Sequence, residues 1–337
     1  VTGYTYTFLM NGETPADGWV GLFRCGEKVR LRFINAAAMT FFDVRIPGLK
    51  LTVVATDGQD IEPVTVDEFR IGVAETFDVV VEPEGDSAYT VFAQAIDRSG
   101  YARGTLTPDP SLSAPVPEMD PLPILTHGDM GMDHAGHDMS GMDHSQHDMG
   151  DNQSMDHSMH DMDGHKTLDH SMHNMGGSHS MDHSLRDMSS ANPSRPAMGS
   201  GRAGYGGNRP ITHAETEFGP HVDMRADGAI YRLDDPGVGL RDNGRRVLTY
   251  ADLRNLHETP DPREAGREIE LHLTGNMSRY MWSVNGVKFA DAEPLRLEYG
   301  ERVRITLVND TMMNHPIHLH GMWSDLETGD GRHIPRK

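Results

Sequence analysis

The sequence GEKVRLRFIN at residues 26–35 is repeated as GERVRITLVN at residues 300–309. In both copies apolar and polar side chains alternate, which predicts a strand with one buried face. A second pair of similar segments lies upstream and is separated by the same number of residues, with YTFLMNG at residues 6–12 and YMWSVNG at residues 280–286. These segments show the same alternation. The chain therefore carries two copies of one β-rich unit.

Further short β-type runs follow in the first copy, at residues 51–58, 69–83 and 88–96, separated by Gly, Pro and Asp. Neither copy has the period of a long amphipathic helix. We therefore expect an all-β protein with two related Greek-key β-sandwich domains.

The segment between the two copies has a different composition. Residues 102–204 contain no Phe, Tyr or Trp, and Leu168 and Leu185 are the only Val, Ile or Leu residues between Thr126 and Pro210. So few apolar groups cannot offset the entropy of ordering, which predicts a disordered linker. The expected domains are residues 1–108, a linker at 109–210 and a second sandwich at 211–337.

Composition excludes several classes of function. The formal net charge of −21 disfavours a nucleic-acid partner and favours cations as ligands. No apolar run approaches the length that a membrane span needs. Cys25 is the sole cysteine, so neither an internal disulfide nor a cysteine-based zinc site is expected.

The linker contains five related octapeptides, MDHAGHDM, MDHSQHDM, MDHSMHDM, LDHSMHNM and MDHSLRDM, which start at residues 132, 142, 155, 168 and 181. Met thioethers select Cu(I), and imidazole binds copper in either oxidation state, so we expect weak copper capture here. The alternative is an acidic low-complexity spacer with incidental His. The expected capture residues are Met132, His134, His137, Met139, Met142, His144, His147, Met149, Met155, His157, His160, Met162, His170, His173, Met175, Met181, His183 and Met188.

The second copy contains HPIHLHG at residues 315–321. On a strand His318 and His320 would project from one face while Leu319 is buried on the other. Three imidazoles in so short a run suit copper or zinc, and a His-rich edge strand without metal is the alternative. Met312, Met313 and Met322 flank the run, where packing is a more common role for Met than guiding Cu(I).

The first copy has no ligand at the aligned positions. When the alignment is shifted by one residue after the repeated strand, Phe42, Arg45 and Pro47 stand at the positions of His315, His318 and His320. We therefore expect only the second copy to bind metal. Lys337 aligns with about Pro63, although the first copy continues its strand pattern to about Thr105. We therefore expect a fragment of a longer protein.

The run HPIHLHG after ERVRITLVN, with MWSVNGVKFADAEPLRLEYGE before it, resembles the last domain of multicopper oxidases. The match is best with the bacterial periplasmic copper-resistance protein A type, which also carries a Met/His-rich insert. The resemblance implies that the β-sandwich domains are cupredoxin-like, and that the intact protein holds a type 1 copper and a trinuclear type 2 and type 3 cluster. By position, His315 resembles a type 1 ligand, His318 a type 2 ligand and His320 a type 3 ligand.

The resemblance also implies an activity, namely oxidation of Cu(I), with phenols as a second candidate, while O2 is reduced to water. The remaining ligands would come from a first domain and a C-terminal His-Cys-His stretch that this chain lacks. Cys25 has no His nearby and is no substitute. Residues 1–337 alone are therefore expected to be inactive. The competing hypothesis is a copper storage protein acting through its linker, which would not need His315, His318 and His320.

Overall fold

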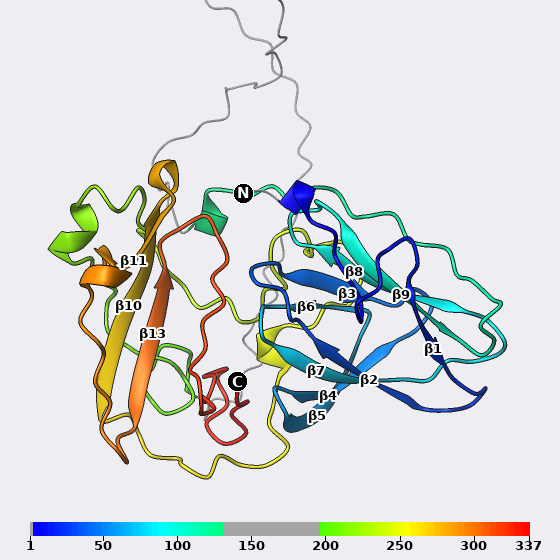
Figure 1. Ribbon diagram of the computed structural model, residues 1–337. Helices are drawn as coiled ribbons and strands as arrows, with labels where there is room; N and C mark the ends of the chain where they lie inside the picture. The colour runs from blue at the N-terminus through cyan, green and yellow to red at the C-terminus, as the bar shows by residue number, and fades with distance from the viewer. Residues whose placement is uncertain (1–2, 131–195) are drawn as a thin grey trace, which may run out of the picture. The chain divides into compact units, whose positions relative to one another are not determined.

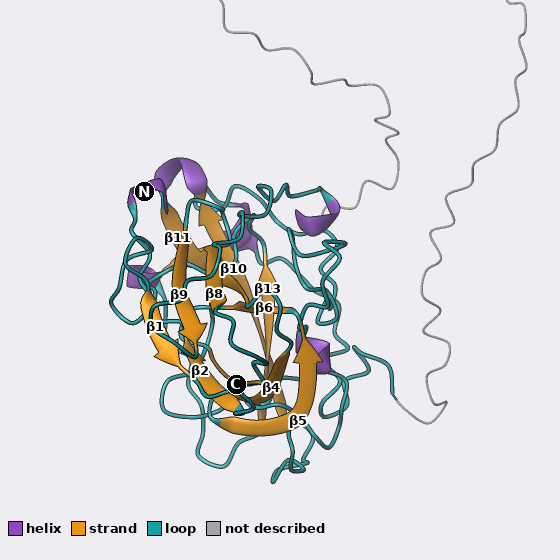
Figure 2. Ribbon diagram, turned by 90° about the vertical axis from the view of Figure 1, so that its right-hand side faces the viewer, coloured by secondary structure: helices purple, strands orange, loops and turns teal. Residues whose placement is uncertain are grey.

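The computed structural model describes residues 3–130 and 196–337. Within these ranges the regular structure consists of strands and of 3-10 helices of three or four residues (Figure 2). The all-β prediction is therefore confirmed for the described residues. No helix among them is long and apolar enough to cross a membrane. The octapeptides lie outside the described residues.

The first copy is a sandwich of two sheets (Figure 1). One sheet has the order β1-β9-β8-β3-β6, with β1 (Trp19–Leu22) parallel to β9 (Tyr101–Thr107). The chain crosses repeatedly between the two sheets and stays within one sheet for two hairpins. Such crossings are the Greek-key connections of a β-sandwich, as expected. The remaining strands of this sheet are antiparallel and comprise β3 (Phe42–Arg45), β6 (Glu68–Ile71) and β8 (Tyr89–Ala95).

The other sheet has the order β2-β7-β4-β5. Its strands are β2 (Val29–Ile34), β4 (Leu51–Thr56), β5 (Gln59–Val66) and β7 (Thr76–Val81). Alternate residues of β4 and β7 face the other sheet, so Leu51, Val53, Phe77 and Val79 are buried with Phe69 in one apolar core.

The second copy forms a four-stranded sheet with the order β12-β11-β10-β13. Its longest strand, β10 (Arg267–Asn276), lies parallel to β13 (Val303–Asn309), which is the predicted repeat strand. On its other side β10 is antiparallel to β11 (Met281–Val284), which turns into β12 (Val287–Lys288).

The repeat is visible in matching details of the two copies. Asn11-Gly12 and Asn285-Gly286 both adopt positive φ, as a tight Asn-Gly hairpin turn requires. At the end of the repeat strand the amide of Asn35 donates to the Thr40 carbonyl, at 2.8 Å, and that of Asn309 donates to the Met313 carbonyl, at 2.7 Å. This hydrogen bond from the Asn side chain to the carbonyl of the following loop, which we name the Asn clamp, therefore ends the strand in both copies.

One predicted strand is absent. Residues 6–12 form no strand in the structure, and Met10 pairs with Glu13 in a single antiparallel bridge. In the second copy the corresponding strand, at residues 281–284, pairs with a neighbouring strand on each side, whereas among the described residues 6–12 there is only the bridge from Met10 to Glu13.

The first part of the predicted linker makes defined contacts with the sandwich. Asp120 accepts from the side-chain amide of Gln94 at 2.7 Å and forms an ion pair with Arg45 at 3.3 Å. The boundaries at 108 and 210 remain a prediction. Residues 131–195 of the predicted linker lie outside the described part of the chain.

A buried ion network joins β3 to β6. The carboxylate of Asp43 is fully buried and accepts two hydrogen bonds from Arg70, at 2.7 and 3.0 Å, and one from Arg98 at 2.8 Å. Arg70 also donates to the Val238 carbonyl at 3.0 Å, which connects the sandwich to the second half of the chain. Removing this one carboxylate would leave two buried guanidinium groups without their charge partner.

We expect Asp43→Asn to lower the free energy of unfolding by about 3–5 kcal/mol, the usual cost of removing one partner from a buried ion pair. Urea denaturation followed by tryptophan fluorescence measures it. Glu82→Gln is the matched control, because Glu82 pairs with Lys28 on the exposed surface and its loss should cost under about 1 kcal/mol. Equal effects of the two substitutions would contradict this account of the network.

Candidate functional site

The His run lies in the loop that follows β13. Residues 310–320 are irregular, so the predicted strand is wrong, and Leu319 is 40% exposed where burial was expected. Pro316 has no N–H to donate to a ladder, which accounts for the irregular backbone between His315 and His318 but not for that at residues 318–320. Alternation along a strand therefore does not position these histidines.

His318 and His320 nevertheless lie together. Their rings stack with centroids 4.9 Å apart and an interplanar angle of 11°, and their Nε2 atoms are 3.1 Å apart. Both side chains are exposed. Two imidazole nitrogens this close can share one proton or bind a metal ion.

His315 lies in a different environment. Its Nε2 is 2.7 Å from the Thr311 hydroxyl, and its ring packs edge-on against Trp282 at 5.2 Å. Burial lowers the pKa of His315, which favours the neutral ring. The Thr311 hydroxyl donates to the Asn309 side-chain oxygen at 2.9 Å, so it accepts from His315 Nε2–H. Nδ1 of His315 therefore keeps its lone pair for a metal.

The neighbouring methionines do not fill a core. Met312 is 52% exposed and Met322 is 59% exposed, so the packing role that we favoured is wrong for these two residues. Cys25 lies exposed in a turn.

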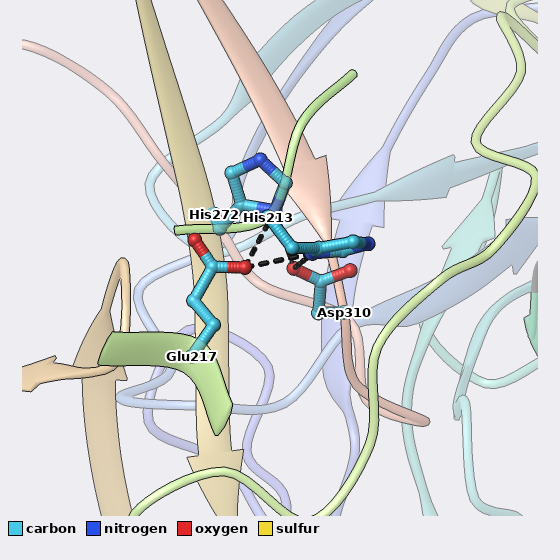
Figure 3. A group of neighbouring side chains, drawn as sticks. All are labelled: His213, Glu217, His272 and Asp310. Carbon is cyan, nitrogen blue, oxygen red and sulfur yellow. Dashed lines mark hydrogen bonds and ion pairs between the residues drawn. The ribbon is translucent and has the colours of Figure 1, made fainter. Parts of the chain in front are cut away.

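A second group of metal-binding side chains was not predicted from the sequence. His213, Glu217, His272 and Asp310 each direct one ligand atom to a common point, and these four atoms lie within 4.8 Å of one another (Figure 3). Glu217 lies in the short helix η4 (Glu215–Phe218), and His213 lies just before this helix. His272 is on β10, and Asp310 directly follows β13.

Strand pairing and loop contacts hold this group together. The parallel register pairs His272 with Val308 and Leu273 with Asn309, which brings Asp310 beside His272. Helix η4 docks on the Asn285-Gly286 turn, where the Thr216 hydroxyl donates to the Asn285 carbonyl at 2.7 Å. A Cβ at Gly286 would lie 2.3 Å from the Thr216 carbonyl oxygen, so this close approach requires glycine.

The group is buried and strongly polar. Glu217, His272 and Asp310 have side chains at most 2% exposed, and His213 is 19% exposed. Burial acts to lower the pKa of His272, but its hydrogen bonds to Glu270 and Asp310 outweigh burial and raise it. In the sequence, the four-residue spacing of His213 and Glu217 is the one local pattern that could indicate a metal site here. His272 and Asp310 come from distant segments.

Comparison with known proteins identifies the family. The multicopper oxidase family models match residues 2–110 and 262–336, which together make up more than half of the chain. Copper resistance protein A of Escherichia coli is 58% identical over 337 residues, which cover 100% of this chain and 53% of that protein. Copper resistance protein A of Pseudomonas syringae pv. tomato is 60% identical, with the same two coverages.

The chain spans about half the length of these curated relatives. The resemblance first seen in the repeated strand and the His run thus extends along the whole chain, including the segment between the two copies. The chain belongs to the multicopper oxidase family and is similar throughout to copper resistance proteins A.

Proposed function

We propose that this chain forms part of a copper-dependent oxidase that oxidises Cu(I), with O2 reduced to water, and serves copper resistance. Phenols are a second substrate class. The observation that carries the proposal is the pair of exposed, stacked imidazoles of His318 and His320, with Nε2 atoms 3.1 Å apart, in a chain of this family. We place the protein in the periplasm by its resemblance to bacterial copper-resistance oxidases.

The residues present fit copper by their chemistry. Neutral imidazole nitrogens bind copper in both oxidation states. His315 offers Nδ1 because Thr311 engages its other nitrogen, and burial lowers the pKa of the ring, which favours its neutral form. By resemblance, His315 serves a type 1 copper, His318 a type 2 copper and His320 a type 3 copper. Copper supplies one-electron transfer at this centre, so that four electrons from the substrate can reduce one O2.

The chain's own residues then orient the ligands. The Asn309 clamp holds the loop after β13, Thr311 fixes the tautomer of His315, and Trp282 packs against its ring. The first copy has Ala37 at the position of Thr311, so it retains the clamp without the residue that orients a ligand.

The Met/His-rich octapeptides would collect copper for this oxidase. Storage through the octapeptides alone is a weaker proposal, because it gives no role to His315, His318 and His320.

We expect Cu(I) to shift the ring NMR signals of His318 and His320 together in the full chain. His318→Ala should weaken the effect of copper on His320 by at least about tenfold, because within residues 1–337 these two adjacent imidazoles, with Nε2 atoms 3.1 Å apart, would hold one ion together. Isotope-edited spectra resolve each histidine, so copper held by the octapeptides does not obscure the result.

His257→Ala is the matched control, since His257 is an exposed histidine outside the run. It should leave the copper response of His320 unchanged. Shifts confined to other histidines at saturating Cu(I), or a response of His320 that ignores His318→Ala, would refute copper binding by this pair.

Replacing the methionines of the five octapeptides by leucine should remove roughly half or more of the Cu(I) bound per chain, because thioethers are the soft ligands of these units. Competition with a colorimetric Cu(I) chelator measures the number of ions bound. Replacing the aspartates of the same octapeptides by asparagine should change this number little. A Cu(I) capacity that survives loss of the methionines would rule out thioether capture.

A further inference from the structure

The group formed by His213, Glu217, His272 and Asp310 has the dimensions of a small metal site. The inward atoms are 2.7 Å apart for His213 Nδ1 and Glu217 Oε2, and 2.6 Å apart for His272 Nδ1 and Asp310 Oδ2. Between these two pairs, His213 Nδ1 lies 3.9 Å from Asp310 Oδ2, and His272 Nδ1 lies 3.4 Å from Glu217 Oε2. A tetrahedron with bonds of about 2.0 Å has edges of about 3.3 Å. The separations between the inward atoms range from 2.6 Å to within 4.8 Å, so side-chain movements on the order of 1 Å would accommodate an ion.

Each of the four side chains has a second nitrogen or oxygen atom that faces away from the group, and each of these outer atoms has a hydrogen-bond partner. Nε2 of His213 lies 3.2 Å from the Ala226 carbonyl, and Nε2 of His272 lies 3.0 Å from a Glu270 carboxylate oxygen. Both partners only accept hydrogen bonds, so each ring carries its proton on Nε2. This arrangement leaves both Nδ1 atoms facing inward, as in metal sites whose histidines are oriented by an outer acceptor.

The two carboxylates are oriented in the same way. The outer oxygen of Glu217 accepts from the Ala214 N–H at 3.2 Å, and that of Asp310 accepts from the Ala226 N–H at 2.7 Å. One oxygen of each is therefore held by the backbone, and the other points into the group (Figure 3). The backbone thus fixes the direction of both inward oxygens.

Charge distinguishes this group from a simple salt bridge. Two buried carboxylates carry two negative charges, which two additional protons on the histidines or one divalent cation would neutralise. A single divalent ion provides that neutralisation and uses all four inward atoms.

We propose that His213, Glu217, His272 and Asp310 bind one divalent transition-metal ion of the Zn2+ type, at a site separate from the His315–His320 run. Two imidazoles and two carboxylates form a tetrahedral set for such an ion. All four ligands come from the protein and the site is buried, so the ion has a structural role. It fastens helix η4 and residues 213–226 to β10 and to the end of β13.

The ion also stabilises the start of the copper-ligand loop. Asp310 directly precedes Thr311, which holds His315. The first copy has Ala36 at the position of Asp310, so it lacks this ligand although it has the same strand and clamp.

Co2+ tests the proposal in the full chain after chelator treatment, because tetrahedral Co2+ absorbs visible light far more strongly than six-coordinate Co2+. We expect one equivalent to give an intense visible band that equimolar Zn2+ removes. His213→Gln should weaken Co2+ binding by at least about tenfold. The double variant His318→Gln/His320→Gln and the single variant His257→Gln should retain the band.

Glu270→Gln is a second test that leaves all four ligands in place. It replaces the carboxylate that accepts from His272 Nε2 and from the Thr212 N–H, and it should weaken binding by about 10–100-fold even if His213→Gln fails to fold. An absent band in the unmodified chain, a band unaffected by both His213→Gln and Glu270→Gln, or a band lost with His318 and His320 would each overturn the proposal. The first of these results would show that protons alone neutralise the group.

Discussion

The parallel pairing of β10 with β13 is the interaction on which the chemistry of the second copy depends. Its register places His272 beside Val308 and brings the end of β13 next to β10. Asp310 and the Asn309 clamp begin at that point, and the loop with His315, His318 and His320 follows from it. A shift of one residue would turn His272 to the opposite face of the sheet and away from Asp310.

The two copies show how chemistry can be added to one scaffold. Both keep the alternating strand, the Asn-Gly turn and the Asn clamp. The differences lie directly after the strand, where Ala36 and Ala37 of the first copy are replaced by Asp310 and Thr311. The core of the sandwich needs no change for these substitutions, because they lie at a strand end and in the following loop.

Sequence reasoning predicted the repeated strand and the all-β class, because period-two alternation reports directly on burial. It also recognised the family from the His run. It was wrong about the strand at residues 318–320, where alternating polar and apolar residues lie in a loop. The group around His272 could not be predicted, since strand pairing and the docking of η4, rather than local sequence, bring its ligands together.

Copper binding by the histidines of the loop after β13 can be observed by anomalous diffraction at the copper absorption edge, from crystals of the copper-loaded chain. We expect an anomalous peak at coordination distance, about 2.0–2.1 Å, from Nε2 of His318 or His320. Fully occupied copper peaks elsewhere on the chain, with none at this pair, would contradict it.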